Sequence, residues 1–308
     1  MKNISKEDET KKISFFKVLM FLITLWLISV IASSFFTINE DEYAYGNVAV
    51  IKLYGTISTT PDDSFGSSGF SANEVIELLD KADKDPNVQA IVLDINSGGG
   101  APVGSDEIGK KLQSINKTKV ALIRDVGASG AYWIASNTDY IVANKMSLVG
   151  SIGVIGSYVE VNGLLKKYNI TYRRIVSGKY KDAGSPLKEL TPDEEKMLQS
   201  LVDELHGYFV EEVAKNRNLS IEEVEKLATG EVFTGVKSKE LGLIDQVGGI
   251  DDVTYYLNNK LNATIEYKPI EKKETLSDIL RKMSAEHGYS IGEGMGSFLY
   301  KENTVIKT

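Results

Sequence analysis

The stretch AIVLDI at residues 90–95, followed at once by Asn96-Ser97-Gly98-Gly99-Gly100, decides the fold of this chain. An almost continuous apolar run of this length is typical of a parallel strand that is buried on both faces. Glycines directly after such a strand permit a tight turn that exposes backbone N–H groups. The stretch therefore predicts a buried parallel strand that ends in a loop able to hold an oxyanion or a phosphate. The alternative is a plain strand-to-helix turn; it is not a P-loop, because no Gly-Lys-Ser/Thr follows.

Strand-like and helix-like segments alternate on both sides of this stretch. Further strands are predicted at residues 47–53, 120–124, 141–143 and 171–175. Helices are predicted at residues 71–82, 105–115, 129–136, 163–168, 191–216 and 220–228, and residues 251–258 close the body. Such alternation implies βαβ units with right-handed crossovers. We therefore expect an α/β domain with a mostly parallel sheet over residues 47–270.

Composition narrows the possible functions. The chain has 308 residues, of which 42% are hydrophobic, so it can bury a sizeable core. Its formal net charge of −8 argues against a nucleic-acid partner, which would require a basic face. There is no cysteine, which excludes disulfides, thiolate metal sites and a cysteine nucleophile. The two histidines, His206 and His287, fall in a predicted helix and in the tail.

Residues 18–38 contain no charged side chain. As a helix, this segment is long enough to span the hydrocarbon core of a bilayer. Lysines precede this segment and acidic residues follow it, so we expect residues 1–17 in the cytoplasm and the rest of the chain on the outer side of the cell membrane. A cleaved signal peptide is the alternative and gives the same topology. Residues 39–46 form a linker, and residues 271–308 are expected to be a loosely ordered tail.

A serine flanked by small residues lies at a second strand-to-helix junction, in the segment Gly127-Ala128-Ser129-Gly130-Ala131-Tyr132. This arrangement exposes the Ser129 Oγ and directs the next backbone N–H groups toward whatever it attacks. Ser129 could instead be an ordinary helix N-cap, which is a common role for serine. The segment is not the Gly-x-Ser-x-Gly elbow, because Ala131 stands in place of the last glycine.

A serine nucleophile needs a base, and the chain offers lysines for this role. The segment SGKYKDAGSP at residues 177–186 holds Lys179 and Lys181 among small residues. Lysine can act as a general base where its pKa is lowered toward neutrality. Lysines in such a loop are otherwise simply solvated.

Four segments in order resemble the signal peptide peptidase A (protease IV) enzymes of the S49 family of serine proteases. They are DINSGGG at residues 94–100, ASGAY at 128–132, VGSIGV at 149–154 and SGKYKD at 177–182. The resemblance runs from about residue 47 to residue 252. It implies a crotonase/Clp-protease-like fold, which would follow the N-terminal transmembrane helix predicted above.

The resemblance also assigns roles to residues. It implies Ser129 as the nucleophile, Lys181 rather than Lys179 as the general base, and Ser151 as the residue that orients the lysine. The N–H groups of Gly99 and Gly130 would form the oxyanion hole. The family usually has a proline where this chain has Gly98, so we expect a looser oxyanion loop.

Together these features predict a membrane-anchored serine endopeptidase that works through an acyl-enzyme and needs no metal or cofactor. The resemblance implies signal peptides or other unfolded peptides as substrates, and a homo-oligomeric ring in which neighbouring protomers contribute the serine and the lysine. Two alternatives remain. One is an acyl-CoA hydratase or isomerase of the same fold, and the other is a membrane-tethered scaffold without catalytic activity.

Overall fold

The computed structural model describes residues 17–31, 46–61 and 69–271. Tyr45–Glu271 form one compact unit. Residues 17–31, which belong to a second unit, form a helix. Among the described residues, no helix is both long enough and apolar enough to cross a membrane. The remainder of the predicted anchor, residues 32–38, and the tail from residue 272 lie outside the described residues.

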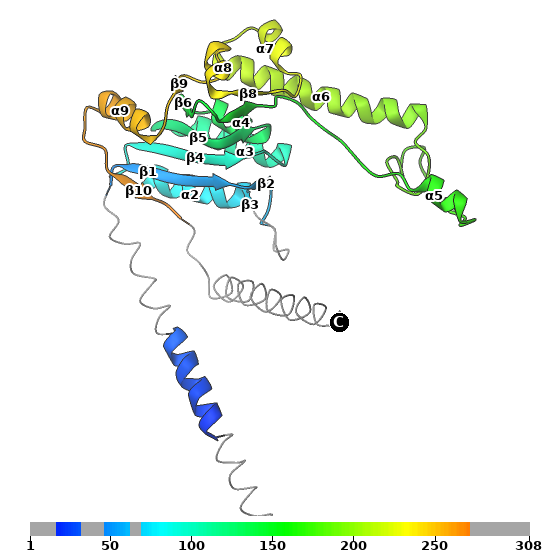
Figure 1. The fold of residues 1–308 in the computed structure, drawn as a ribbon, viewed down its shortest axis with the longest axis horizontal. Helices are drawn as coiled ribbons and strands as arrows, with labels where there is room; N and C mark the ends of the chain where they lie inside the picture. The colour runs from blue at the N-terminus through cyan, green and yellow to red at the C-terminus, as the bar shows by residue number, and fades with distance from the viewer. Residues whose placement is uncertain (1–16, 32–45, 62–68, 272–308) are drawn as a thin grey trace, which may run out of the picture. The chain divides into compact units, whose positions relative to one another are not determined.

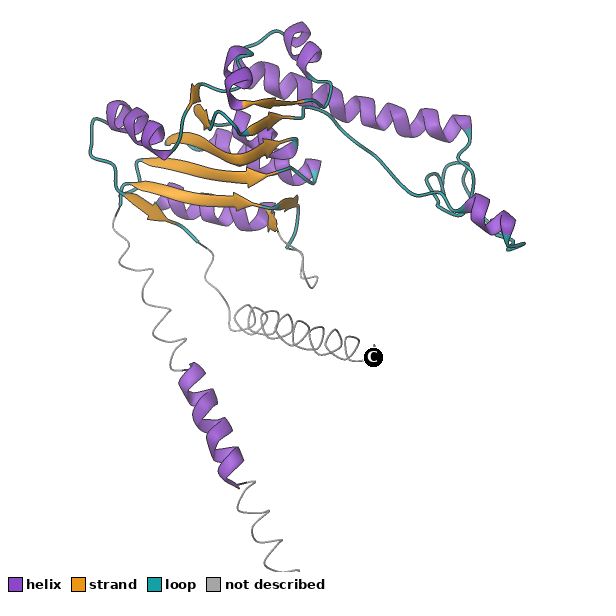
Figure 2. Ribbon diagram, in the orientation of Figure 1, coloured by secondary structure: helices purple, strands orange, loops and turns teal. Residues whose placement is uncertain are grey.

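Strands and helices alternate along the compact unit (Figures 1 and 2). The strands are β1 (Val48–Tyr54), β2 (Thr56–Ser58), β3 (Gly69–Ser71), β4 (Ala90–Ser97), β5 (Thr118–Ala128), β6 (Tyr140–Ala143), β7 (Leu148–Gly150), β8 (Val232–Thr234), β9 (Gln246–Val247) and β10 (Tyr267–Pro269). The helices are α2 (Ala72–Lys84), α3 (Pro102–Ser114), α4 (Gly130–Ser136), α5 (Asn162–Lys167), α6 (Pro192–Arg217), α7 (Ile221–Leu227), α8 (Gly235–Glu240) and α9 (Ile250–Leu261).

The main sheet has the strand order β10-β1-β4-β5-β6-β9, and β7 extends it by pairing with β5 and β8. Every pairing in it is parallel except that of β7 with β8. A short second sheet joins β2 to β3. The predicted α/β class with a mostly parallel sheet is therefore confirmed.

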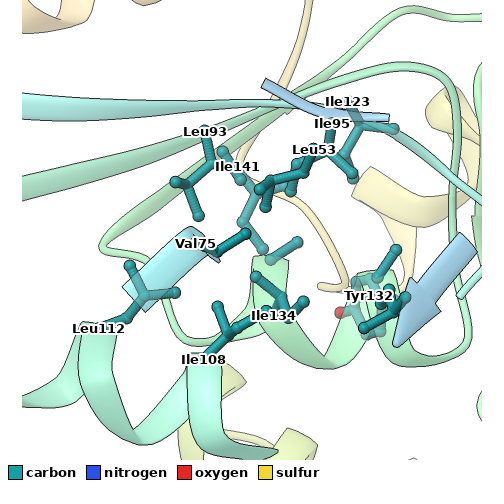
Figure 3. Packing of buried hydrophobic residues seen from close by; sticks show 14 of the residues in the cluster. Leu53, Val75, Leu93, Ile95, Ile108, Leu112, Ile123, Tyr132, Ile134 and Ile141 are labelled. Carbon is teal, nitrogen blue, oxygen red and sulfur yellow. The ribbon is translucent and has the colours of Figure 1, made fainter. Parts of the chain in front are cut away.

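β4 lies in the middle of the sheet, and all of its residues except Asn96 are buried. The face that carries Leu93 and Ile95 is covered by α2, α3 and α4, whose apolar side chains interlock with the strands (Figure 3). On the other face, Val92 packs in a smaller cluster with Val253 and Leu257 of α9. Burial on both faces explains why this strand is an apolar run without alternation.

Helix starts follow local capping rules. Ser71 caps α2 and Glu74 completes the capping box. α6 opens with Thr191 as its cap and Pro192 in its first turn. The caps Ser71 and Thr191 thus mark the residue directly before the start of each helix.

The predicted strand at residues 171–175 is wrong, because these residues form no strand. They belong to residues 154–191, which we call the arm. The arm carries α5 and runs beside α6, beyond the sheet (Figure 1). β-branched residues form a strand only where a neighbouring strand pairs with them, and no strand of the sheet lies beside the arm.

Candidate active site

Ser129 lies at the turn between the end of β5 and the start of α4. Its backbone has φ 53° and ψ −128°, and a positive φ is strained for any residue other than glycine. The Ser129 side chain makes no capping hydrogen bond to α4. The helix-cap alternative therefore does not describe what this side chain does. The geometry matches a sharp strand–turn–helix that presents a nucleophile.

The glycine loop after β4 packs directly against this turn. Gly99 has φ +102°, and an added Cβ there would lie 2.8 Å from Ser129 Cβ and 2.8 Å from Gly130 N. A side chain at Gly99 would therefore displace the serine or its neighbour. By contrast, a Cβ added at Gly98 would meet no atom within 4 Å, so space does not require a glycine at that position.

The Gly99 N–H has an acceptor inside its own loop. It donates to Ser97 Oγ at 3.1 Å, and Ser97 Oγ in turn donates to the carbonyl of Gly55 at 2.5 Å. The side chain of Ser97 thus ties the glycine loop to the end of β1. The oxyanion role of the Gly99 and Gly130 N–H groups remains a prediction.

Ser151 is placed beside Ser129 by strand pairing. β5 and β7 run parallel with Ala128 opposite Gly150, so the next residue on each strand is one of the two serines. The Ser129 N–H donates to the carbonyl of Gly150 at 2.8 Å. Ser151 also has a positive φ, 49°, and its N–H donates to the carbonyl of Glu231 at 2.8 Å. The fold therefore brings together four of the five predicted site residues.

Lys181 lies apart from them. It is exposed on the arm, which Figure 1 shows extending away from α4 along α6. Within the part of the chain that the structure describes, the Lys181 amine has no hydrogen-bond or ion-pair partner. A single chain thus brings Ser129 and the glycine loop together without Lys181.

Lys179 differs from Lys181 in its partner. Its amine lies 2.5 Å from the carboxylate of Asp193, and this hydrogen bond raises the pKa of Lys179. A lysine held in its charged form cannot accept a proton. The Lys179 amine is therefore the less available of the two, and the choice of Lys181 as the base remains a prediction.

His206 has no connection to Ser129. It lies on α6, where its Nε2 is 2.9 Å from the carbonyl of Ala228. His287 lies outside the described residues.

Asn96 is the residue whose role the sequence did not reveal. The pairing register of β4 with β5 shifts between Ile95 and Ser97. Over this stretch, two residues along β4 correspond to four residues along β5. The Asn96 side chain fills this irregularity, because its Oδ1 accepts from the Val126 N–H and its Nδ2 donates to Asp125, both at 3.1 Å. The only available signal was its place directly before the glycine loop. Asn96 fixes the end of the strand that carries Ser129.

Replacing Asn96 with alanine is expected to lower kcat/KM on an unfolded protein substrate by about tenfold to a hundredfold. The Val126 N–H would lose its acceptor, which costs about 1–3 kcal/mol, and the end of β5 would become less well placed. The matched control is Asn259→Ala on the exposed surface of α9, which should keep full activity. Wild-type kinetics in Asn96→Ala would show that the side chain does not position the serine.

Comparison with known proteins places the chain in a family. Residues 111–264 match the model of peptidase family S49. A candidate protease of Methanocaldococcus jannaschii is 34% identical over 305 residues, covering 94% of this chain and 96% of that protein. The chloroplastic serine protease SPPA of Arabidopsis thaliana is 29% identical over 264 residues, covering 84% and 38%. Protease 4 of Haemophilus influenzae is 32% identical over 212 residues, covering 67% and 33%.

These matches decide between the alternatives that the sequence left open. They favour neither an acyl-CoA hydratase nor a scaffold without catalytic activity, since the family is one of peptidases. The protein belongs to peptidase family S49 and is a serine protease of that family.

Proposed function

We propose that the protein is a Ser/Lys endopeptidase in which Ser129 is the nucleophile and Lys181 the general base. The observation that carries this proposal is the turn at Ser129, whose strained backbone packs against Gly99. Strain of this kind persists where the surrounding structure imposes it, commonly at catalytic residues. The order of elements around the turn also supports the crotonase/Clp-protease-like fold that the resemblance implies.

The reaction is acyl transfer in two stages. The neutral Lys181 amine takes the Ser129 proton while Oγ bonds to the peptide carbonyl carbon. The oxyanion is stabilised by the N–H of Gly130 and by the N–H of Gly99, which would turn to it from Ser97 Oγ. The C–N bond then breaks as the lysine returns the proton to the leaving amine. Water, deprotonated by the same amine, releases the acyl group and regenerates Ser129. Ser151, which follows β7 as Ser129 follows the paired strand β5, would hydrogen-bond the incoming lysine.

The lysine is supplied by a neighbouring protomer of a ring. Lys181 is an exposed residue of the arm, and Figure 1 shows the arm extending away from α4, the helix that begins directly after Ser129. The arm also exposes large apolar side chains, of which Ile155 is 87%, Val159 75% and Ile175 97% exposed. Such side chains on one extended segment are typical of a surface that another protein covers. Assembly would thus complete the site and cover the arm.

The substrates are unfolded peptides, including signal peptides, and the site lies at the outer face of the cell membrane. One relative, from Enterococcus faecium, carries the name of a signal peptide peptidase. Residues 18–38 form the proposed membrane span, with lysines on its cytoplasmic side. Apolar side chains of the described helix over residues 17–31 are exposed, including Phe21 at 63% and Ile28 at 62%. Their exposure is consistent with contact with lipid.

Complementation between inactive variants tests the shared site. Ser129→Ala and Lys181→Ala, co-expressed in equal amounts, are expected to regain about a quarter of wild-type activity. Random assembly in a closed ring leaves an intact serine and an intact lysine facing each other at about one site in four. The control is the double variant Ser129→Ala/Lys181→Ala co-expressed with Ser129→Ala, which should stay inactive. No recovery in mixed rings would show that each chain must supply both residues.

A further inference from the structure

Arg174 clamps the turn that carries Lys181. Its guanidinium makes a bidentate pair with Asp182, from Nε to Oδ2 at 2.6 Å and from Nη2 to Oδ1 at 2.8 Å. Nη2 also donates to the carbonyl of Lys179 at 3.3 Å. Arg174 therefore holds the chain before and after Lys181. Arg174 itself belongs to residues 171–175, the segment that the sequence predicts to be a strand.

The other carboxylates around this turn have partners of their own. Lys179 pairs with Asp193 at 2.5 Å, and Lys188 pairs with Glu194 at 2.6 Å. Glu194 is also fixed by the capping box of α6. The remaining charged residues of the arm are Glu160, Lys166, Lys167, Arg173 and Glu189, of which Lys166 and Glu189 lie 3.5 Å apart. Asp182 is the carboxylate next to Lys181 in sequence.

Asp182 follows Lys181 directly in the chain, and although the two side chains form no ion pair within one protomer, its charge becomes a chemical problem for a lysine base once the assembled site encloses both residues. A carboxylate close to an ammonium group favours the charged form of the amine, whereas a general base must be neutral. The Asp182 side chain is only 13% exposed, so water screens its charge incompletely. A guanidinium in a bidentate pair cancels that charge and keeps its own proton at any working pH.

We propose that Arg174 is a positioning residue of the active site, which fixes the Lys181 turn and neutralises Asp182 so that the lysine can act as a base near neutral pH. The proposal rests on the function proposed above for Lys181. It assigns Arg174 no contact with the substrate or with Ser129.

The test is the pH dependence of kcat/KM for cleavage of a fluorogenic unfolded peptide. Activity should rise with pH as the Lys181 amine loses its proton. In Arg174→Gln, Asp182 is no longer neutralised, so the midpoint of this rise should move upward by on the order of one pH unit. Activity at pH 7 should fall by about tenfold, while the plateau at high pH should stay close to that of the wild type.

Removing both charges separates this effect from a loss of structure. Asp182→Asn alone should move the midpoint downward, because Arg174 then adds an uncompensated positive charge. The double variant Arg174→Gln/Asp182→Asn should return the midpoint to within a few tenths of a unit of the wild type. Arg173→Gln is the matched control, since it removes the same charge from the neighbouring residue, which makes no contact with Asp182.

Each outcome has a definite meaning. If Lys181→Ala retains activity, the proposed function fails, whatever Arg174 does. If Lys181→Ala is inactive but Arg174→Gln has an unshifted midpoint, Lys181 stands as the base and the inference about Arg174 is overturned. If Arg174→Gln does not fold, Asp182→Asn decides alone, because an unshifted midpoint there overturns the inference. A uniform loss of activity at every pH, not relieved in the double variant, would likewise assign Arg174 a purely structural role.

Discussion

Replacing Ser129 with alanine is expected to reduce peptide hydrolysis by on the order of 10⁴- to 10⁶-fold, because no other group can form the acyl-enzyme. The measurement is turnover of an unfolded, casein-like substrate by the purified variant. The matched control is Ser114→Ala at the exposed end of α3, which should keep wild-type turnover. Retained cleavage in Ser129→Ala would remove this serine from the mechanism.

Ser129→Gly adds a second readout to the same position. Glycine adopts a φ of 53° without strain, so this variant should be as inactive as Ser129→Ala but more stable than it by about 1 kcal/mol. Thermal unfolding of the two variants measures this difference. Equal stability would mean that the turn imposes no strain on residue 129.

Replacing Lys181 with alanine is expected to lower kcat by about 10²- to 10⁴-fold, the contribution typical of a general base. Lys179→Ala should keep activity within tenfold of the wild type, because the Lys179 amine is already paired with Asp193. Lys181→Arg should be as inactive as Lys181→Ala, since a guanidinium does not lose its proton at working pH. If Lys179→Ala lost activity and Lys181→Ala did not, Lys179 and not Lys181 would be the general base.

The sign of the pH effect follows from the same chemistry. With lysine as the proposed base the neutral amine is the active form, so wild-type kcat/KM should be low at acidic pH and rise as the pH increases. Any activity left in Lys181→Ala should lack this rise. A pH–rate profile that is flat in the wild type would exclude lysine as the base.

Much of the fold can be predicted because its central strands carry their own signal. β4 is buried on both faces, and an unbroken apolar run leaves few other interpretations. β2, β7, β8, β9 and β10 have only two or three residues each, too few for any period to appear. The error at residues 171–175 has the opposite cause, since the local preference for a strand was present but no partner strand was.

The site residues likewise fall into those that the sequence can predict and those that it cannot. Ser129 and Gly99 each follow a predicted strand of one sheet, so predicting these strands already brings the two residues to one edge. Ser151 follows β7, which the sequence did not predict, and only the family resemblance pointed to it. The role of Asn96 depends on a register shift between β4 and β5, which no local pattern encodes. The distance between Lys181 and Ser129 depends on how far the arm leaves the body, and that is a property of the tertiary structure alone.

The strands at the ends of the main sheet bear on how this protein can associate with others. β10, at one end, has three residues, the last of which is Pro269, and β9, at the other, has two. A proline offers no N–H to an incoming strand, and edges this short give little template for strand addition from another molecule. The sheet therefore has little tendency to grow by joining sheets edge to edge, even at high local concentration. Association is left to side-chain surfaces, which can specify a closed assembly of fixed size where an open sheet edge would allow indefinite growth.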